Sequence, residues 1–190
     1  MPHPKNVRGL TLIELIVTIA LMAILTGFAS MSWTKLAAAT RHTDLVNGTR
    51  RMFAIARSHA VHHKTLTTIC PLSTTGACID EWDKPISIFP DNDNNRRPDG
   101  GVIHRTIRLS KTNSILISRT AGRGYFQLAA NGMSHGTMGS LIACSKDDDS
   151  IVKMSYIALN IGGRLRTLHD ENGDGNITLP WGTEISCPSP

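Results

Sequence analysis

Residues 9–33 read GLTLIELIVTIALMAILTGFASMSW and follow a short basic leader. The 19 residues from Leu10 to Phe28 are almost wholly apolar, a length that just crosses ~30 Å of hydrocarbon at ~1.5 Å per residue. Glu14 is the one charge among them, and a charged side chain at the centre of a bilayer costs on the order of 3 kcal/mol. The stretch therefore predicts a single-pass membrane helix with one carboxylate near its start.

In an ordinary secretory signal the cleavage site follows the apolar core, so the core is lost. Here Gly9 precedes the core and Glu14 lies near its start, a pattern that resembles the class III signal of type IV pilins and pseudopilins. The resemblance implies that prepilin peptidase cuts between Gly9 and Leu10, and that Leu10, where the family usually has Phe, becomes the methylated N-terminus. Glu14 would then be the fifth mature residue and would compensate the N-terminal amine of a neighbouring subunit. The alternative is a plain N-terminal anchor with an incidental glutamate.

The length and composition fit one globular domain after this segment. The whole chain has 190 residues, of which 41% are hydrophobic and 18% are charged. Such a composition excludes an intrinsically disordered chain. The net charge is +5, of which Lys5 and Arg8 in the leader supply two. A net positive charge this small indicates little about binding partners, so the positions of the charged residues matter more than their sum. By the positive-inside rule, the two leader residues stay in the cytoplasm and the rest of the chain is exported.

All four cysteines lie on the exported side, at positions 70, 78, 144 and 187. An even number of cysteines in an oxidising compartment indicates disulfides. The spacing favours a close pair, Cys70–Cys78, and a distant pair, Cys144–Cys187, which would tie the tail back to the domain. The other pairings stay open.

The helical pattern continues beyond the apolar stretch, without proline, as far as Lys64. One helix from about Thr11 to Lys64 is therefore expected, apolar all round in its first half and amphipathic in its second. Short β-like runs with Pro-, Gly- and Asn-rich separators follow. The expected strands are residues 66–70, 86–89, 102–109, 115–118, 125–129, 140–143, 152–159 and 164–168. Antiparallel strands after one long helix predict an α+β domain whose sheet packs on the helix.

Four features of the domain occur together: a cysteine in the first strand with another eight residues later, Trp82, the turn FPDNDN at residues 89–94, and GRLR at residues 163–166. This combination resembles the minor pilins and pseudopilins of the GspH, FimT and FimU group. The resemblance implies the type IV pilin fold. It also implies other major or minor pilins or pseudopilins, and prepilin peptidase, as partners.

The resemblance divides the chain into four parts. These are a leader (1–9), a transmembrane or filament-core helix (10–33), the amphipathic second half of the helix (34–64), and a periplasmic or extracellular β domain with a disulfide-tied tail (65–190). The protein is expected first in the inner membrane, crossing it once, and then in a pilus or pseudopilus.

Catalytic and metal motifs are weak. No P-loop, GxSxG or HExxH motif occurs, so neither an enzyme nor a cofactor is expected. His59, His62 and His63 share a helix face but have no acid nearby in sequence. Histidines beside the helix C-terminal dipole explain them better than a metal does.

Two acidic segments resemble calcium loops. Asp170, Asn172 and Asp174 offer oxygens at alternate positions, yet Trp181 occupies the position of the bidentate glutamate. A plain turn is therefore the preferred interpretation, with calcium as the alternative. Asp91, Asp93 and Asn95 are a weaker version.

Basic residues are the remaining candidates, because no acid occurs between Gly101 and Ser145. Arg164 and Arg166 are two apart and would share a strand face, and guanidinium groups bind phosphates in bidentate fashion. In FimT-type minor pilins the GRxR element is associated with binding extracellular DNA during natural transformation. The resemblance therefore assigns binding of double-stranded DNA to Arg164 and Arg166. From charge alone the prediction extends to Lys111, Arg119 and Arg123.

Three functions follow from these residues. The first is a DNA-capturing subunit that uses Arg164 and Arg166. The second is a purely structural subunit that primes filament assembly through the apolar helix and Glu14. The third is a type II secretion pseudopilin that contacts exported proteins.

Overall fold

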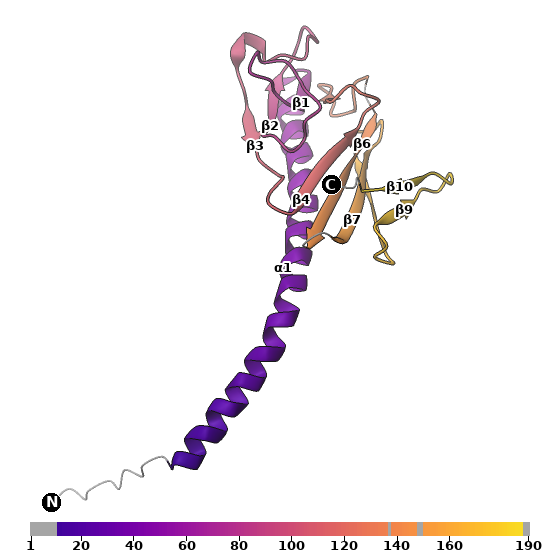
Figure 1. The fold of residues 1–190 in the computed structure, drawn as a ribbon. Helices are drawn as coiled ribbons and strands as arrows, with labels where there is room; N and C mark the ends of the chain where they lie inside the picture. The colour runs from indigo at the N-terminus through magenta and orange to yellow at the C-terminus, as the bar shows by residue number, and fades with distance from the viewer. Residues whose placement is uncertain (1–10, 137, 148–149, 188–190) are drawn as a thin grey trace, which may run out of the picture. The chain divides into compact units, whose positions relative to one another are not determined.

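One long helix runs through the first third of the chain in a computed structural model, which describes all residues except 1–10, 137, 148–149 and 188–190 (Figure 1). The helix α1 spans Leu12–His63, as the sequence predicts, because no proline interrupts it. The chain divides into two compact units, Met1–Ala37 and Ala38–Pro190. Gly9 and Leu10, the predicted cleavage site, lie outside the described residues.

The N-terminal unit exposes an apolar surface. The described side chains from Thr11 to Gly27 are all exposed, and Leu12, Ile13 and Met22 are each about 70% exposed (77%, 71% and 69%). Apolar area of this kind requires a lipid or protein neighbour. Within the described residues, however, no helix meets the combined length and hydropathy of a membrane span.

The first sheet has four antiparallel strands in the order β3-β2-β1-β5. Their bounds are β1 Thr67–Pro71, β2 Ile86–Pro90, β3 Arg105–Ile107 and β5 Phe126–Leu128. A short 3-10 helix, η1 Asp99–Gly101, lies between β2 and β3. The predicted strand 102–109 is therefore too long. Residues 102–104 are exposed and lie outside the ladder, which pairs Ile88 with Arg105.

The second sheet is also antiparallel, in the order β4-β6-β7-β8 (Figure 1). Its strands are β4 Ser114–Arg119, β6 Gly139–Asp147, β7 Ser150–Leu159 and β8 Leu165–His169. The order leaves β4 and β8 as the edges. Since β5 pairs with β1 in the other sheet, the chain crosses between the two sheets twice after β4.

One hydrophobic core joins the second half of α1 to both sheets. Met52, Phe53 and Ala56 from the helix pack with Phe126 of β5 and Leu141 of β6. The Phe53 and Phe126 rings meet edge to face, with centroids 5.2 Å apart, a favoured aromatic geometry. The helix therefore covers one face of the second sheet, and the α+β class is confirmed.

The opposite face of the second sheet is covered by a hairpin that the sequence did not predict. Its strands are β9 Asn176–Thr178 and β10 Glu184–Ser186. Ile177 and Ile185 pack on Ile142 and Met154 in a second small core. The disulfide Cys144–Cys187 fastens this hairpin to β6, and in the loop-entropy account a loop of this length contributes about 4 kcal/mol.

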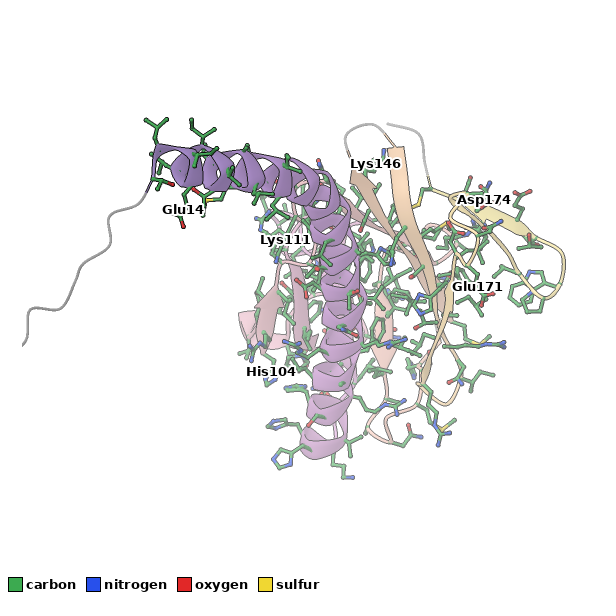
Figure 2. All side chains as sticks on the ribbon, turned by 90° about the horizontal axis from the view of Figure 1, so that it is seen from below. Glu14, His104, Lys111, Lys146, Glu171 and Asp174 are labelled. Carbon is green, nitrogen blue, oxygen red and sulfur yellow. A yellow bond between two sulfur atoms is a disulfide. The ribbon has the colours of Figure 1, made fainter. Side chains whose placement is uncertain are left out.

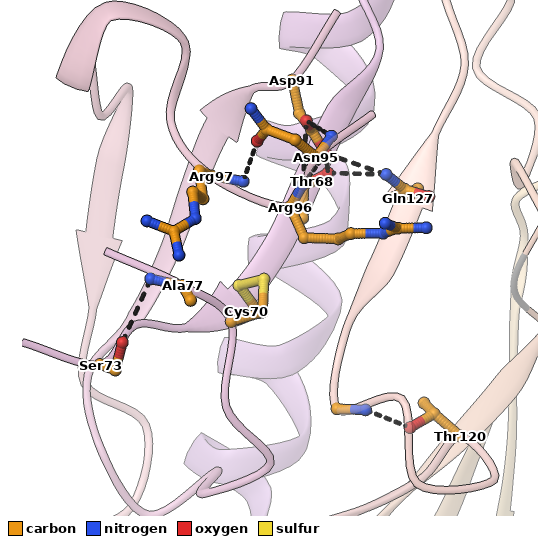
Figure 3. The surroundings of a disulfide bond; sticks show 12 residues. Thr68, Cys70, Ser73, Ala77, Asp91, Asn95, Arg96, Arg97, Thr120 and Gln127 are labelled. Carbon is orange, nitrogen blue, oxygen red and sulfur yellow. Dashed lines mark hydrogen bonds between the residues drawn. A yellow bond between two sulfur atoms is a disulfide. The ribbon is translucent and has the colours of Figure 1, made fainter. Parts of the chain in front are cut away.

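The other disulfide joins Cys70 at the end of β1 to Cys78 (Figure 3). These are the two pairs that the spacing favoured. Beside Cys70, Asp91 is fully buried and accepts hydrogen bonds from the Thr68 hydroxyl and the Gln127 amide. The Asn95 and Arg96 backbone N–H groups also donate to Asp91, so this carboxylate organises the turn after β2.

Candidate functional site

Glu14 lies in the first turn of α1 (Figure 2). Its backbone N–H donates to the Thr11 hydroxyl at 3.3 Å, an arrangement typical of a helix start. The side chain is exposed, and within the described part of the chain no cation forms an ion pair with its carboxylate. The carboxylate is therefore available to a partner.

The GRLR motif begins in the turn between β7 and β8, with Gly163 and Arg164, and continues into β8 with Leu165 and Arg166. Gly163 has a φ of +67°, and a β carbon at this position would lie 2.2 Å from the Gly132 carbonyl oxygen and 2.3 Å from Nη2 of Arg57. Only glycine fits. Arg57, on α1, donates to the Gly162 carbonyl at 2.8 Å, so the glycine brings a helical guanidinium against the turn.

Arg164 precedes β8 rather than lying on it, so the predicted strand start is wrong, and so is the prediction that Arg164 and Arg166 share a strand face. Its backbone N–H donates to the Asn160 side chain at 2.8 Å, which closes the turn. The exposed Arg164 side chain lines a depression together with Arg50 and Arg57 of α1. Three guanidinium groups therefore lie together beside the start of β8, on the side of the sheet that α1 covers.

Arg166 and Arg119 lie in one row across the second sheet. The pairing register runs from Arg119 to Ser140, from Ser140 to Ala158 and from Ala158 to Arg166. Directly paired residues share a face, and three strand spacings separate the two arginines by roughly 14 Å. Leu141, next to Ser140, faces the α1 core, so both arginines are on the face away from the helix.

These five residues, Arg50, Arg57, Arg119, Arg164 and Arg166, are named here the arginine surface. Among the described side chains, none of the five forms an ion pair. The nearest acids along β8, Asp170 and Glu171, follow the opposite end of the strand. The arginine surface therefore presents positive charge without an ion pair on both faces of the second sheet, at the end where β4 finishes and β8 begins.

The other two predicted basic residues differ in their positions. Arg123 follows β4 at the end where Arg119 lies, and its guanidinium donates to the Gly136 carbonyl at 3.0 Å. Lys111 lies at the opposite end of β4, next to Ser114. The structure therefore places Arg123 beside the arginine surface and separates Lys111 from it.

Trp181 is a further residue beside the arginine surface. The sequence singled it out only because it occupies the position of the bidentate glutamate in the calcium-loop pattern. It lies in the turn between β9 and β10, is 68% exposed, and lines a groove with Arg119, Met138 and Tyr156. An exposed indole beside arginine is a common nucleic-acid contact, because every base can stack on it. In the sequence, the only indication of an exposed tryptophan here is its place between two turn-forming residues, Pro180 and Gly182.

The calcium candidates are engaged in turn hydrogen bonds. The Asp170 carboxylate accepts from the Gly173 and Gly175 N–H groups at 2.7 and 2.8 Å, and Glu171 and Asp174 lie beside the hairpin (Figure 2). The described residues gather three carboxylates at one point elsewhere, at Asp91, Asp93 and Asp99. This acidic cluster accepts hydrogen bonds from its own loop.

Two histidines have perturbed ionisation. Burial lowers the pKa of His42 to about 4, with Lys153 and His169 acting in the same direction. The His42 nitrogens lie 3.1 Å from the Ser145 hydroxyl and 2.8 Å from that of Ser155. His59 also has a lowered pKa, through burial and then through neighbouring histidines, first His104.

The family model for the type II transport protein GspH matches residues 46–160, more than half of the chain. The chain belongs to the GspH family. A second model, the prokaryotic N-terminal methylation motif, matches residues 4–30 of this GspH-family protein. The chain is therefore a type IV pilin-like minor pilin or pseudopilin, a subunit of a type IV pilus or of a type II secretion system.

No curated protein matches the GspH-family chain. Similar solved structures include two crystal forms, P65 and P21, of the type IV minor pilin FimU from Pseudomonas aeruginosa PAO1. Both are 18% identical to the chain. They cover 68% and 74% of it, and 91% and 92% of their own chains, with TM-scores of 0.46 and 0.45.

Proposed function

We propose that this GspH-family subunit binds DNA through its arginine surface and acts in DNA uptake for natural transformation. The observation that carries the proposal is the grouping of five arginines from α1, β4, the β7–β8 turn and β8 around one end of the second sheet. The sequence separates these residues by up to 116 positions, yet the fold gathers them at one end of the second sheet.

The chemistry of the surface suits a phosphate backbone. Guanidinium groups take phosphates in bidentate geometry, and each neutralised phosphate releases counterions, so affinity falls as salt rises. The spacing of Arg119 and Arg166, roughly 14 Å, lets the two side chains contact different phosphates of one duplex, whose charges lie about 3.4 Å apart along the axis of each strand. Contacts of this kind bind without sequence preference.

The placement of the subunit is part of the same proposal. Prepilin peptidase would cut after Gly9, and the retained apolar helix would hold the subunit as a single-pass protein in the inner membrane and then in the filament core. The exposed apolar side chains of α1 support this placement, because they need a lipid or protein neighbour. The protein would have no enzymatic activity and would need no cofactor.

A type II secretion role is the second candidate. The matching family model is described as a type II transport protein, and Trp181 and Met138 are exposed apolar groups of the kind that contact proteins. In that case the same groove would contact exported proteins. A purely structural priming role would use the helix alone.

Removing Arg164 and Arg166 should weaken duplex binding and lower its salt dependence. In the double variant Arg164→Ala/Arg166→Ala, the slope of log K against log salt should fall by about 2, one unit for each lost phosphate contact. The measurement is a mobility shift of labelled duplex by the purified chain in detergent at several salt concentrations.

The matched control is Arg105→Ala/Lys111→Ala, which removes the same charge from outside the arginine surface. It should keep the wild-type slope. Equal losses in the two double variants would show that net charge alone binds DNA, and no shift even at low salt would remove the DNA proposal and leave the secretion or priming role.

A further inference from the structure

A cleft of about 400 Å³ lies between α1 and the part of the second sheet where β7 begins and β8 ends. Its size is within the range of small-ligand sites. The arginine surface lies at the other end of β8, and Arg50 alone lines both. The polar lining of the cleft comes from His42, Asn47 and Arg50 of α1, from Lys153 of β7, and from His169 and Asp170 at the end of β8.

Two basic side chains of the sheet face α1 in this cleft. The Ser155 hydroxyl oxygen lies 2.8 Å from Nε2 of His42 and 2.8 Å from Nδ1 of His169, so one hydroxyl joins the helix to β8. Lys153 and Ser155 are two apart on β7 and therefore share a face. Lys153 and His169 both act to lower the pKa of the buried His42, so both lie near its ring.

The helix supplies the opposite wall of the cleft. His42, Val46 and Arg50 are spaced by four residues, so they share one face of α1. A long side chain on a helix leans towards the preceding turn, which directs the exposed Arg50 side chain back along α1 towards the cleft. The exposed Asn47 amide adds a neutral hydrogen-bond donor.

The balance of charge in the cleft is positive. Among the described side chains, neither Arg50 nor Lys153 forms an ion pair. Asp170 is the one acid in the described lining, and its two oxygens accept hydrogen bonds from the Gly173 and Gly175 N–H groups of its own turn. Two fixed positive charges against one such carboxylate favour an anion.

We propose that this cleft binds a phosphate group, with Arg50, Lys153 and His169 as its contacts. A guanidinium group takes phosphate oxygens in bidentate fashion, and a lysine ammonium group acts as a point charge. Because Ser155 engages Nδ1 of the exposed His169, the Nε2 atom remains to donate to the anion. Free phosphate and an anionic phospholipid headgroup share this chemistry. The inference does not depend on DNA binding.

The test is a calorimetric titration of inorganic phosphate into the full chain, in non-ionic detergent and a phosphate-free buffer. Wild type should bind one phosphate, and Lys153→Gln should weaken binding about tenfold or more through loss of a charge-assisted contact. His169→Ala should weaken it as well. Asp170→Asn should bind severalfold more tightly, because it removes the one negative charge of the described lining.

Lys64→Gln is the matched control. It removes the same charge from an exposed position just beyond the end of α1, roughly 30 Å from His42 along the helix, and should bind phosphate like wild type. The inference is overturned if wild type shows no saturable binding. It is also overturned if Lys153→Gln and Asp170→Asn both bind as wild type does.

Two further titrations identify the source of the phosphate group. Short-chain phosphatidylglycerol is anionic, and phosphatidylcholine of the same chain length is its zwitterionic control. Tighter binding of phosphatidylglycerol than of inorganic phosphate, lost in Lys153→Gln, would support a lipid headgroup, and the reverse order would support free phosphate. Equal binding of the two lipids, unchanged in Lys153→Gln and without phosphate binding, would overturn the inference.

Lys153→Gln also separates this cleft from the arginine surface. The variant should leave the salt dependence of duplex binding at its wild-type value, since Lys153 lies outside that surface. A lower slope in Lys153→Gln with unchanged phosphate binding would make the cleft part of the DNA-binding surface and overturn the inference. Absence of duplex binding in wild type would overturn the DNA proposal only.

Discussion

Glu14→Ala is expected to leave the subunit in the membrane and to abolish its incorporation into filaments. The carboxylate lies in the first turn of α1 among exposed apolar side chains, and no cation of the described chain pairs with it. Burying such a charge without a partner costs several kcal/mol. The N-terminal amine of a neighbouring mature subunit would supply the opposite charge. In the low-dielectric interior of the membrane or filament, the attraction between the two groups is strong.

Glu14→Gln is the matched variant, because it keeps the size of the side chain and removes only its charge. Both variants should be present in the membrane fraction at wild-type level and absent from sheared filaments. Incorporation of Glu14→Gln at the wild-type level would show that charge pairing is not the role of this residue.

Acidification is expected to destabilise the domain through His42. Its folded pKa of about 4 is below the ordinary value of 6.5, so between these values the unfolded chain binds more protons than the folded one. The free energy of unfolding should therefore fall as pH drops below about 6.5, and level off below about 4. The full loss is roughly 3 kcal/mol. Protonation would make both ring nitrogens donors and place a charge beside Lys153 and His169.

The measurement is urea unfolding of the chain in detergent from pH 7 to pH 4, for wild type and His42→Asn. The variant removes the titrating group while keeping a side chain that can bond to Ser145 or Ser155. The difference between the two proteins in how the free energy of unfolding depends on pH gives the contribution of His42. Parallel curves for the two proteins would contradict the assignment, and His135→Gln should behave like wild type.

Local pattern was enough to predict the helix and the position of each strand from β1 to β8. The absence of proline between Thr11 and Lys64 predicted α1, and alternating apolar residues predicted the strands. The β9–β10 hairpin was missed because each of its strands carries a single apolar residue, so neither shows an alternating pattern. Their burial depends on Ile177 and Ile185 meeting the second sheet, a contact that residues 170–190 alone do not reveal.

The site was only partly predictable, because it depends on strand order. Arg119 and Arg166 face the same way only because the order is β4-β6-β7-β8, with β5 in the other sheet. Arg57 and His104 reach their positions through contacts 105 and 45 residues away, to Gly162 and to His59. Charge alone grouped Lys111 with the arginines, and the fold places it at the other end of β4.

The central claim is that the apolar helix survives maturation and joins subunits together. The most direct test is the intact mass, with N-terminal sequence, of the native protein from membranes and filaments. The account predicts a chain that begins at a methylated Leu10 and keeps Glu14 as its fifth residue. A chain that begins at Met1, or one cut beyond Trp33 so that the apolar stretch is lost, would contradict it.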